Sequence, residues 1–246
     1  MDEKRRQLLT GISVAGAGVL LNACRSNPGG ATNNDNRTEP APGEVAPVEV
    51  SAAEDLMREH GILRRALLVY QESATRLRQD PASVPPDTLE KAANLFRVFG
   101  EDYHERKIEE VFVFPIVKKS PGAPASYVDV LLGQHERGRA ITDYVLSLTR
   151  ADRIPSNSLE PLARALESFV RMYEHHAAIE DTVVFPVWKA AVGESELDAL
   201  AAKFEEIEAD HFGGDGFDTA LKRMEEIETS LGLSNLEMFT APEPPK

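Results

Sequence analysis

The chain has 246 residues, 42% of them hydrophobic, which is enough to bury the core of one domain with additional segments. Its formal net charge of -14 at pH 7 argues against binding to nucleic acid and against electrostatic attachment to anionic lipid. A single cysteine excludes an intramolecular disulfide framework and cysteine-based zinc or iron–sulfur sites, so any metal must be held by nitrogen and oxygen atoms.

Residues 1–24 have the pattern of an export signal. Lys4-Arg5-Arg6 precedes an apolar stretch from Ile12 to Leu21, which at about 10 residues is too short to span a bilayer. The paired arginines resemble a twin-arginine signal, which exports folded cargo. Leu21-Asn22-Ala23-Cys24 resembles a bacterial lipobox, although asparagine is unusual there. We therefore expect export to the periplasmic side of the cell envelope, with a lipid on Cys24 as the only membrane contact.

A linker and a first helix are predicted next. Residues 25–50 are rich in Pro, Asn, Gly and Glu and lack hydrophobic periodicity, which predicts a disordered linker. Ser51 and Glu54 have the spacing of a capping box, so a helix is expected from there to about Gln79. Its inward stripe contains His60 among apolar residues.

Three more long helices and two shorter ones are predicted along the rest of the chain. The long helices should run from an Asp87 cap to about Lys119, from about Ala125 to Thr149, and from a Ser158 cap to about Val192. Pro115 and Pro186 lie late in two of them, where proline bends or frays a helix. Residues 193–240 should form two shorter helices, Glu194–Asp210 and Phe217–Leu231, packed as a cap over residues 51–192.

A His-then-Glu pattern occurs twice, in residues 104–115 and 176–186, and both copies end in Phe-Pro. In the second copy His176 and Glu180 are four residues apart, so both point the same way from a helix. His60 precedes His104 by 44 residues, and His135 precedes His176 by 41. The duplication predicts an all-α fold, an up-down four-helix bundle of two hairpins that project imidazole and carboxylate groups into a shared core. That geometry favours two metal ions.

These segments resemble the hemerythrin-like (HHE cation-binding) domain over roughly residues 52–190. The resemblance rests on residues 57–65, 101–105, 134–139 and 172–186. It implies a non-haem di-iron site held by His60, His104, Glu109, His135, His176 and Glu180, with Glu180 bridging the metals. The ligand types suit iron or manganese and would also accept zinc or copper by intrinsic affinity. Two iron ions are expected in preference to manganese or zinc.

The first copy departs from the repeat, because Glu109 lies five residues after His104. On a regular α-helix residues five apart are displaced by about 140° and cannot face one ion. A π-bulge would restore the alignment. Alternatively, Glu105 and Glu109 act together in place of His104, which is favoured by counting back from each Phe-Pro. The segment Glu-Asp-Tyr-His resembles family members in which that His is a ligand, and we prefer His104 with Glu109.

Three further residues bear on the site. Oxygen-carrying hemerythrins have a second His in the third helix where this chain has Arg139, so one terminal ligand is missing or comes from elsewhere. Like charges repel in a low-dielectric core, so Arg139 should pair with a carboxylate outside the site. His175 points about 100° away from His176 and should lie at the surface or behind the ligands. His211 is a further candidate for the open position.

Three functions remain open. The resemblance implies a protein that binds or senses O2, NO or peroxide at an open coordination position. The missing third-helix His favours an alternative, a di-iron enzyme that consumes peroxide or NO or oxidises ferrous iron. A third hypothesis is a helical lipoprotein that stores metal or holds it only for structural stability.

Overall fold

The computed structural model describes residues 50–245. The predicted export signal, and the predicted linker up to residue 49, lie outside the described residues. Within the described part the chain is helical and contains no strand, which confirms the all-α prediction. No helix in this part combines the length and the apolar composition needed to cross a membrane.

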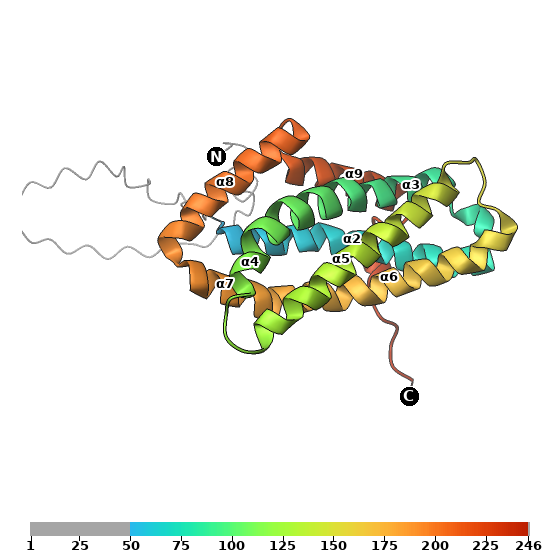
Figure 1. The fold of residues 1–246 in the computed structure, drawn as a ribbon. Coiled ribbons are helices and arrows are strands. Elements are labelled where there is room, and N and C mark those ends of the chain that lie inside the picture. The colour runs from blue at the N-terminus through green and yellow to red at the C-terminus, as the bar shows by residue number, and fades with distance from the viewer. Residues whose placement is uncertain (1–49, 246) are drawn as a thin grey trace, which may run out of the picture. The chain divides into compact units, whose positions relative to one another are not determined.

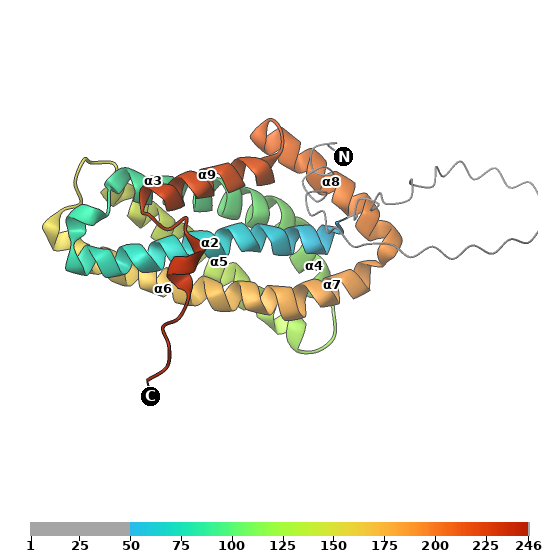
Figure 2. The same ribbon diagram turned by 180° about the vertical axis from the view of Figure 1, so that it is seen from behind.

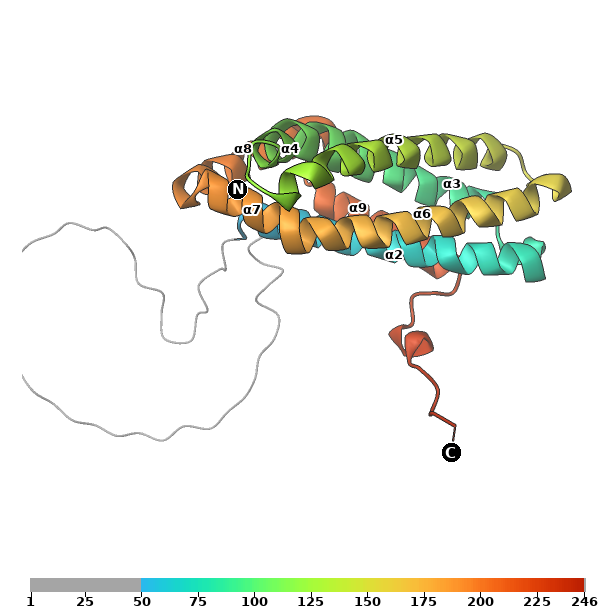
Figure 3. The same cartoon turned by 60° about the horizontal axis from the view of Figure 1, so that its bottom comes forward.

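Four long helical segments lie side by side (Figures 1 and 3). They are α2 (Ala52–Gln79), α3–η2–α4 (Pro86–Leu95, Phe96–Val113 and Phe114–Val117), α5 (Ala123–Thr149) and α6–η4–α7 (Leu159–Ile179, Glu180–Val184 and Phe185–Val192). Short 3-10 turns η1 (Pro81–Ser83) and η3 (Ser156–Ser158) precede the second and fourth segments. The closest packing pairs α2 with α6 and α3 with α5.

The helix starts test three predicted caps. The capping box at the start of α2 is confirmed, since the Ser51 hydroxyl accepts from the Glu54 N–H and the Glu54 carboxylate accepts from the Ser51 N–H at 2.9 Å. The Asp87 cap is wrong: α3 begins at Pro86, whose fixed φ suits a first helical position, and Asp87 lies inside the first turn. Ser158 is the N-cap of α6, but its side chain makes no capping hydrogen bond.

The second and fourth segments both contain π-helix directly before their Phe-Pro pair. The stretch η2 has 18 residues and η4 has 5. At the end of each, a phenylalanine N–H bonds five residues back, from Phe114 to the Glu109 carbonyl and from Phe185 to the Glu180 carbonyl. The prolines that follow lack an N–H, so a regular α-helical bond is missing at the same place in both. The bend expected at Pro115 and Pro186 is thus a widened turn just before each proline.

Two C-terminal helices pack on the outside of these segments. The helix α8 (Glu194–Phe212) contacts α2, α7 and η2, and α9 (Gly216–Ser230) contacts α2 and α3 (Figure 2). Between them Gly213 adopts the left-handed conformation, with φ of 72°. Arg65 of α2 donates to both carboxylate oxygens of Glu228 in α9, at 2.8 and 2.6 Å. The last short helix is η5 (Leu236–Phe239).

Candidate metal centre

The structure brings all six predicted metal ligands together in the interior. His60 comes from α2, His104 and Glu109 from η2, His135 from α5, His176 from α6 and Glu180 from η4. None of the six is more than 3% exposed. Two overlapping groups of these ligands have donor atoms within 4.8 Å of one another, His60–His104–Glu109 and Glu109–His135–His176–Glu180, and a third group, Glu105–Glu110–His135, shares His135 with them.

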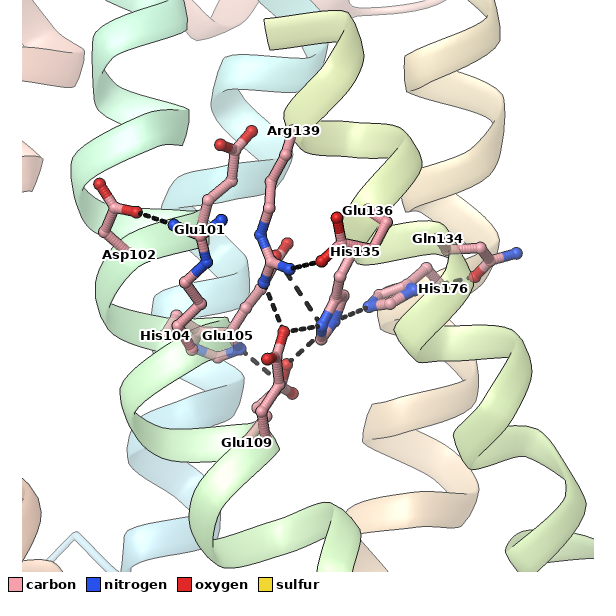
Figure 4. A network of polar contacts seen from close by, with 12 residues as sticks. Glu101, Asp102, His104, Glu105, Glu109, Gln134, His135, Glu136, Arg139 and His176 are labelled. Carbon is pink, nitrogen blue, oxygen red and sulfur yellow. Dashed lines mark hydrogen bonds and ion pairs between the residues drawn. The ribbon is translucent and has the colours of Figure 1, made fainter. Parts of the chain in front are cut away.

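The donor atoms form two similar halves. In one half the Nε2 atoms of His60 and His104 are 3.0 Å apart, and His104 Nε2 lies 3.3 Å from Glu109 Oε1. In the other half the Nε2 atoms of His135 and His176 are 3.2 Å apart, and His135 Nε2 lies 3.5 Å from Glu109 Oε2. Figure 4 shows Glu109 reaching up between His104 and His135. One carboxylate therefore presents an oxygen to each half.

Glu180 also lies close to both halves, but through a single oxygen atom. Its Oε2 lies 3.0 Å from His176 Nε2 and 3.5 Å from His60 Nε2. Among the described residues, all four carboxylate oxygens of Glu109 and Glu180 are buried and none has a hydrogen-bond partner. Buried carboxylates are expensive unless they are paired or coordinate a metal. Two imidazoles per half and two carboxylates shared between the halves fit a pair of cations.

Each histidine is oriented by a hydrogen bond on its other ring nitrogen. The Nδ1 atoms lie 2.6 to 2.9 Å from oxygen acceptors on neighbouring helices: His60 from Asp181, His104 from Glu59, His135 from Glu110 and His176 from Gln134. An acceptor at Nδ1 places the hydrogen there and leaves the Nε2 lone pair for a metal. Sequence reasoning missed these four acceptors, although a signal existed. Each is adjacent in the chain to a predicted ligand.

The four acceptors occur at equivalent positions in the two copies of the repeat, as the ligands do. Glu59 and Gln134 each precede the first histidine of their half, and Glu110 and Asp181 each follow the glutamate. The ring contacts repeat as well, because Phe185 stacks on His60 and Phe114 stacks on His135, both at 5.4 Å between centroids. The two hairpins thus contribute equivalent layers around the centre.

The π-helical stretch resolves the spacing of the first copy. Because π-helical bonds join residues five apart, His104 and Glu109 face the same side of η2. The π-bulge prediction is therefore confirmed. Glu105 lies on another side, where its Oε1 accepts from the Tyr173 hydroxyl at 2.7 Å and its Oε2 from Arg139 at 3.0 Å.

Arg139 pairs with carboxylates, as the sequence predicts. Its guanidinium contacts Glu105, Glu110 and Glu136. Glu110 is also the acceptor for His135 Nδ1, so Arg139 holds in place the carboxylate that orients this ligand. Arg64 has the equivalent position in the first half and pairs with Asp181, the acceptor for His60.

The two remaining histidines lie outside the cluster. His175 is exposed, in agreement with the prediction for it. His211 Nε2 lies 3.1 Å from the Val98 carbonyl oxygen, and its ring stacks on Tyr103. Its nitrogen is directed at the outside of η2, so the suggestion that His211 fills an open position is wrong for this structure.

Opposite charges within the cluster raise the pKa of some ligands and lower the pKa of others. Burial alone would lower the pKa of His104, but the Glu109 carboxylate raises it well above the usual range. Burial would raise the pKa of Glu109, but His104 and His135 lower it well below the usual range.

Of the remaining ligands, His135 and Glu180 have raised pKa values and His176 has a lowered one. Burial opposes protonation of His135, yet the negative charge of Glu105 helps to raise its pKa to about 10. Burial and the neighbouring His135 charge lower the pKa of His176 to about 3. Burial and the Glu109 charge raise the pKa of Glu180 well above its usual range. In the metal-free protein, positive charge on imidazole therefore takes the place of cations.

Metal loading should release protons, and the affinity for metal should rise with pH. In the metal-free protein the raised pKa of His135 keeps its imidazole protonated below about pH 10, whereas an imidazole that binds a metal must be neutral. The raised pKa also means that the stabilisation from protonated His135 is present below pH 6.5 and is lost as the pH rises through 10. We expect about two protons or more per chain on addition of Zn2+ at pH 7.5, measured with a pH indicator. His135→Gln should release about one fewer, and His175→Gln should match the wild type.

A small cavity adjoins the centre. Its volume is about 20 Å³, enough for one water-sized molecule. Three of the histidines and two carboxylates line it, and the other lining residues are mainly apolar: His60, His104, His176, Glu105 and Glu109, with Leu63, Leu67, Phe96, Tyr173 and Ala177. Arg64 also lines the cavity and is 42% exposed in its side chain.

Comparison with known proteins agrees with this site. Residues 126–232 match the Hemerythrin HHE cation binding domain, a range that includes His135, His176 and Glu180. An uncharacterized protein of Mycobacterium bovis and uncharacterized proteins of two Mycobacterium tuberculosis strains are each 40% identical over 238 residues, covering 96% of this chain and 90% of the relative. A search of solved structures gives no match.

Proposed function

We propose, since the chain belongs to the hemerythrin HHE cation-binding family, that it holds a non-haem di-iron centre that binds or senses O2, NO or peroxide. The observation behind the proposal is the pair of two-histidine half-sites joined by Glu109 and Glu180, whose buried oxygens have no hydrogen-bond partner in the described structure. His60 and His104 would hold one iron, and His135 and His176 the other. Both glutamates would be shared.

The surroundings favour a small ligand. When bound, iron supplies a redox-active Lewis acid with open coordination positions. The cavity of about 20 Å³ beside His60, His104 and His176 admits one small molecule, and its apolar walls keep bulk water away. The four oriented imidazoles hold their Nε2 atoms toward the centre, so little rearrangement is needed on loading.

A second candidate function is turnover of peroxide or NO by the same centre. It is favoured by the buried Tyr173 hydroxyl, which lines the cavity and donates to Glu105 at 2.7 Å. A hydroxyl hydrogen-bonded to a carboxylate can position a proton near a ligand in the cavity. Repeated consumption of peroxide beyond one equivalent would distinguish an enzyme from a binding protein.

The helical repeat in the sequence supports a proposal for the fold, and the pattern of residues 1–24 supports one for the location. We infer an up-down four-helix bundle from residues 51–192 with the C-terminal helices as a cap, and export with lipidation at Cys24. Labelling cells with a fatty-acid analogue tests the anchor: the wild-type chain should take up label and Cys24→Ser should not. Label on both variants would place the lipid elsewhere.

The decisive experiment is metal analysis of the anaerobically purified protein, followed by visible spectra before and after air, NO and peroxide. We expect about two iron ions per chain and a new absorption band with at least one of these ligands. A chain that retains one zinc, or no metal, after growth in iron-rich medium would contradict the di-iron proposal and favour a structural bundle.

A further inference from the structure

Away from the Phe-Pro turns, the packed pair of α2 and α6 differs from the packed pair of η2 and α5. The first pair has Leu67 seven residues after His60, and Phe169 and Tyr173 seven and three residues before His176. At the equivalent positions the pair of η2 and α5 has Thr142, Arg97 and Glu101. We call these three residues the polar branch. Since the rest of the site repeats closely, this substitution of polar for apolar residues needs its own explanation.

The outer end of the polar branch reaches solvent. Glu101 itself is only 1% exposed. Its Oε1 accepts from the Thr142 hydroxyl at 2.5 Å, and its Oε2 lies 3.1 Å from Arg97. Arg97 in turn donates to Asp143, whose side chain is 73% exposed. A continuous set of polar contacts therefore joins a buried carboxyl group to the surface.

The inner end approaches the metal centre. Glu105, four residues after Glu101, contacts both Tyr173 and Arg139, and Arg139 contacts Glu110, the acceptor of His135. Among the described residues, Glu101 Oε2, Arg139 Nε and the Tyr70 hydroxyl are buried and make no hydrogen bond, although the first is in ion-pair distance of Arg97. Such atoms are normally satisfied by internal water, which can also pass protons.

Glu101 can change protonation near neutral pH. Burial raises its pKa to about 7, while the hydrogen bond from Thr142 and the charge of Arg97 act in the opposite direction. The charged or titratable groups around it are Arg97 and Glu105 from its own segment, Arg139 and Asp143 from α5, Tyr70 from α2 and Tyr173 from α6. Glu101 touches none of the six proposed metal ligands in the described contacts.

We propose that Glu101 is the residue through which protons pass between solvent and the metal centre, along the polar branch. An O–H bond forms at Glu101 when a proton arrives from solvent water at the Arg97–Asp143 end, and breaks when that proton is passed on to a peroxide oxygen in the cavity, so the carboxyl group returns to its starting state and Arg97 stays protonated throughout. The inference rests on the proposed function. Reduction of peroxide requires such a proton path, because one peroxide and two ferrous ions take up two protons to give two ferric ions and two waters. Binding of NO takes up none.

Infrared titration tests the proton site without any reaction at iron. In the full chain loaded with zinc, where Glu180 would bind the metal as a carboxylate, the C=O stretch of a protonated buried carboxyl group should disappear with a midpoint near pH 7. Glu101→Gln should remove this band. Glu208→Gln should keep it, since Glu208 is equally buried but accepts from the Phe217 N–H in the α8–α9 turn. Thr142→Val should shift the midpoint upward. The same band in Glu101→Gln would overturn the proposal.

Kinetics of the iron-loaded protein test the path. We expect Glu101→Gln to slow the peroxide reaction on the order of 100-fold at pH 7 and to leave NO binding unchanged. Added small weak acids should restore the rate, which a purely structural defect would not allow. Equal peroxide rates in wild type and Glu101→Gln would overturn the inference and leave the proposed function intact. A wild-type chain without iron would instead overturn the proposed function, and the infrared titration would then decide the role of Glu101.

Discussion

His176→Ala is expected to weaken metal binding by more than about 100-fold, while His175→Ala, its neighbour in the chain, is expected to bind as the wild type does. His176 is buried, with its Nε2 at 3.0 Å from Glu180 and 3.2 Å from His135 Nε2, whereas His175 is exposed. Even the loss of an outer partner of a metal-bound histidine typically lowers affinity by about 10–100-fold, so loss of a ligand should exceed that.

The measurement is competition with a chelator of known affinity, with metal content read per chain. Circular dichroism of the metal-free variants serves as the control for folding. Because Glu109 still faces His104, the half-site of His60 and His104 should retain an ion in His176→Ala, and stoichiometry should fall from about two toward one. Equal affinities of the His175 and His176 variants would remove His176 from the ligand set.

Gly138→Ala is expected to destabilise the protein by about 2 kcal/mol, which for a chain of this size lowers Tm by roughly 4–8 °C. A Cβ at Gly138 would lie 2.0 Å from the Tyr173 hydroxyl oxygen and 2.8 Å from its ring carbons. The Tyr173 ring cannot simply move, since it packs against Phe169 at 4.5 Å and His176 at 5.2 Å between centroids. The substitution should also break the bond from Tyr173 to Glu105.

The matched control is Gly133→Ala, which is expected to change the free energy of unfolding in the opposite direction. Gly133 is in the same helix, and a Cβ there would meet nothing within 4 Å. Because alanine is preferred to glycine inside a helix, Gly133→Ala should stabilise the protein by about 0.5–1 kcal/mol. Both values can be read from denaturant unfolding of the metal-free chain. A neutral Gly138→Ala would mean that Tyr173 is free to leave its place beside the cavity.

Spacing in the sequence was enough to predict the helices and to select the residues that meet at the centre. His60, His135, His176 and Glu180 each have apolar residues among their neighbours one turn away, so the direction of each side chain follows from its helix. The segment ends at Gln79, Thr149 and Val192 also agree with the structure, and Pro81 and Gly193 follow the first and the last of them within two residues.

Other features depend on contacts between helices and could not be predicted from local spacing. The choice between His104 and Glu105 turned on whether the helix widens, and η2 does so over 18 residues that have no unusual composition. The Asp87 cap was wrong because the helix starts at Pro86, two residues earlier than an Asp87 cap requires. The acceptors for the four histidines lie on other helices, and only the packed structure pairs Asp181 with His60 or Glu110 with His135.

The hydrogen bonds that orient the histidines form a closed ring around the four segments. His104 and His176 bond within their own hairpins, to Glu59 and Gln134, whereas His60 and His135 bond across to the other hairpin. One hairpin alone thus supplies two imidazoles, one shared carboxylate and half of the ring. Two identical hairpins related by a two-fold axis would supply all of it. The fold is compatible with an ancestor that worked as a homodimer of hairpins, later fused through the connection between α4 and α5.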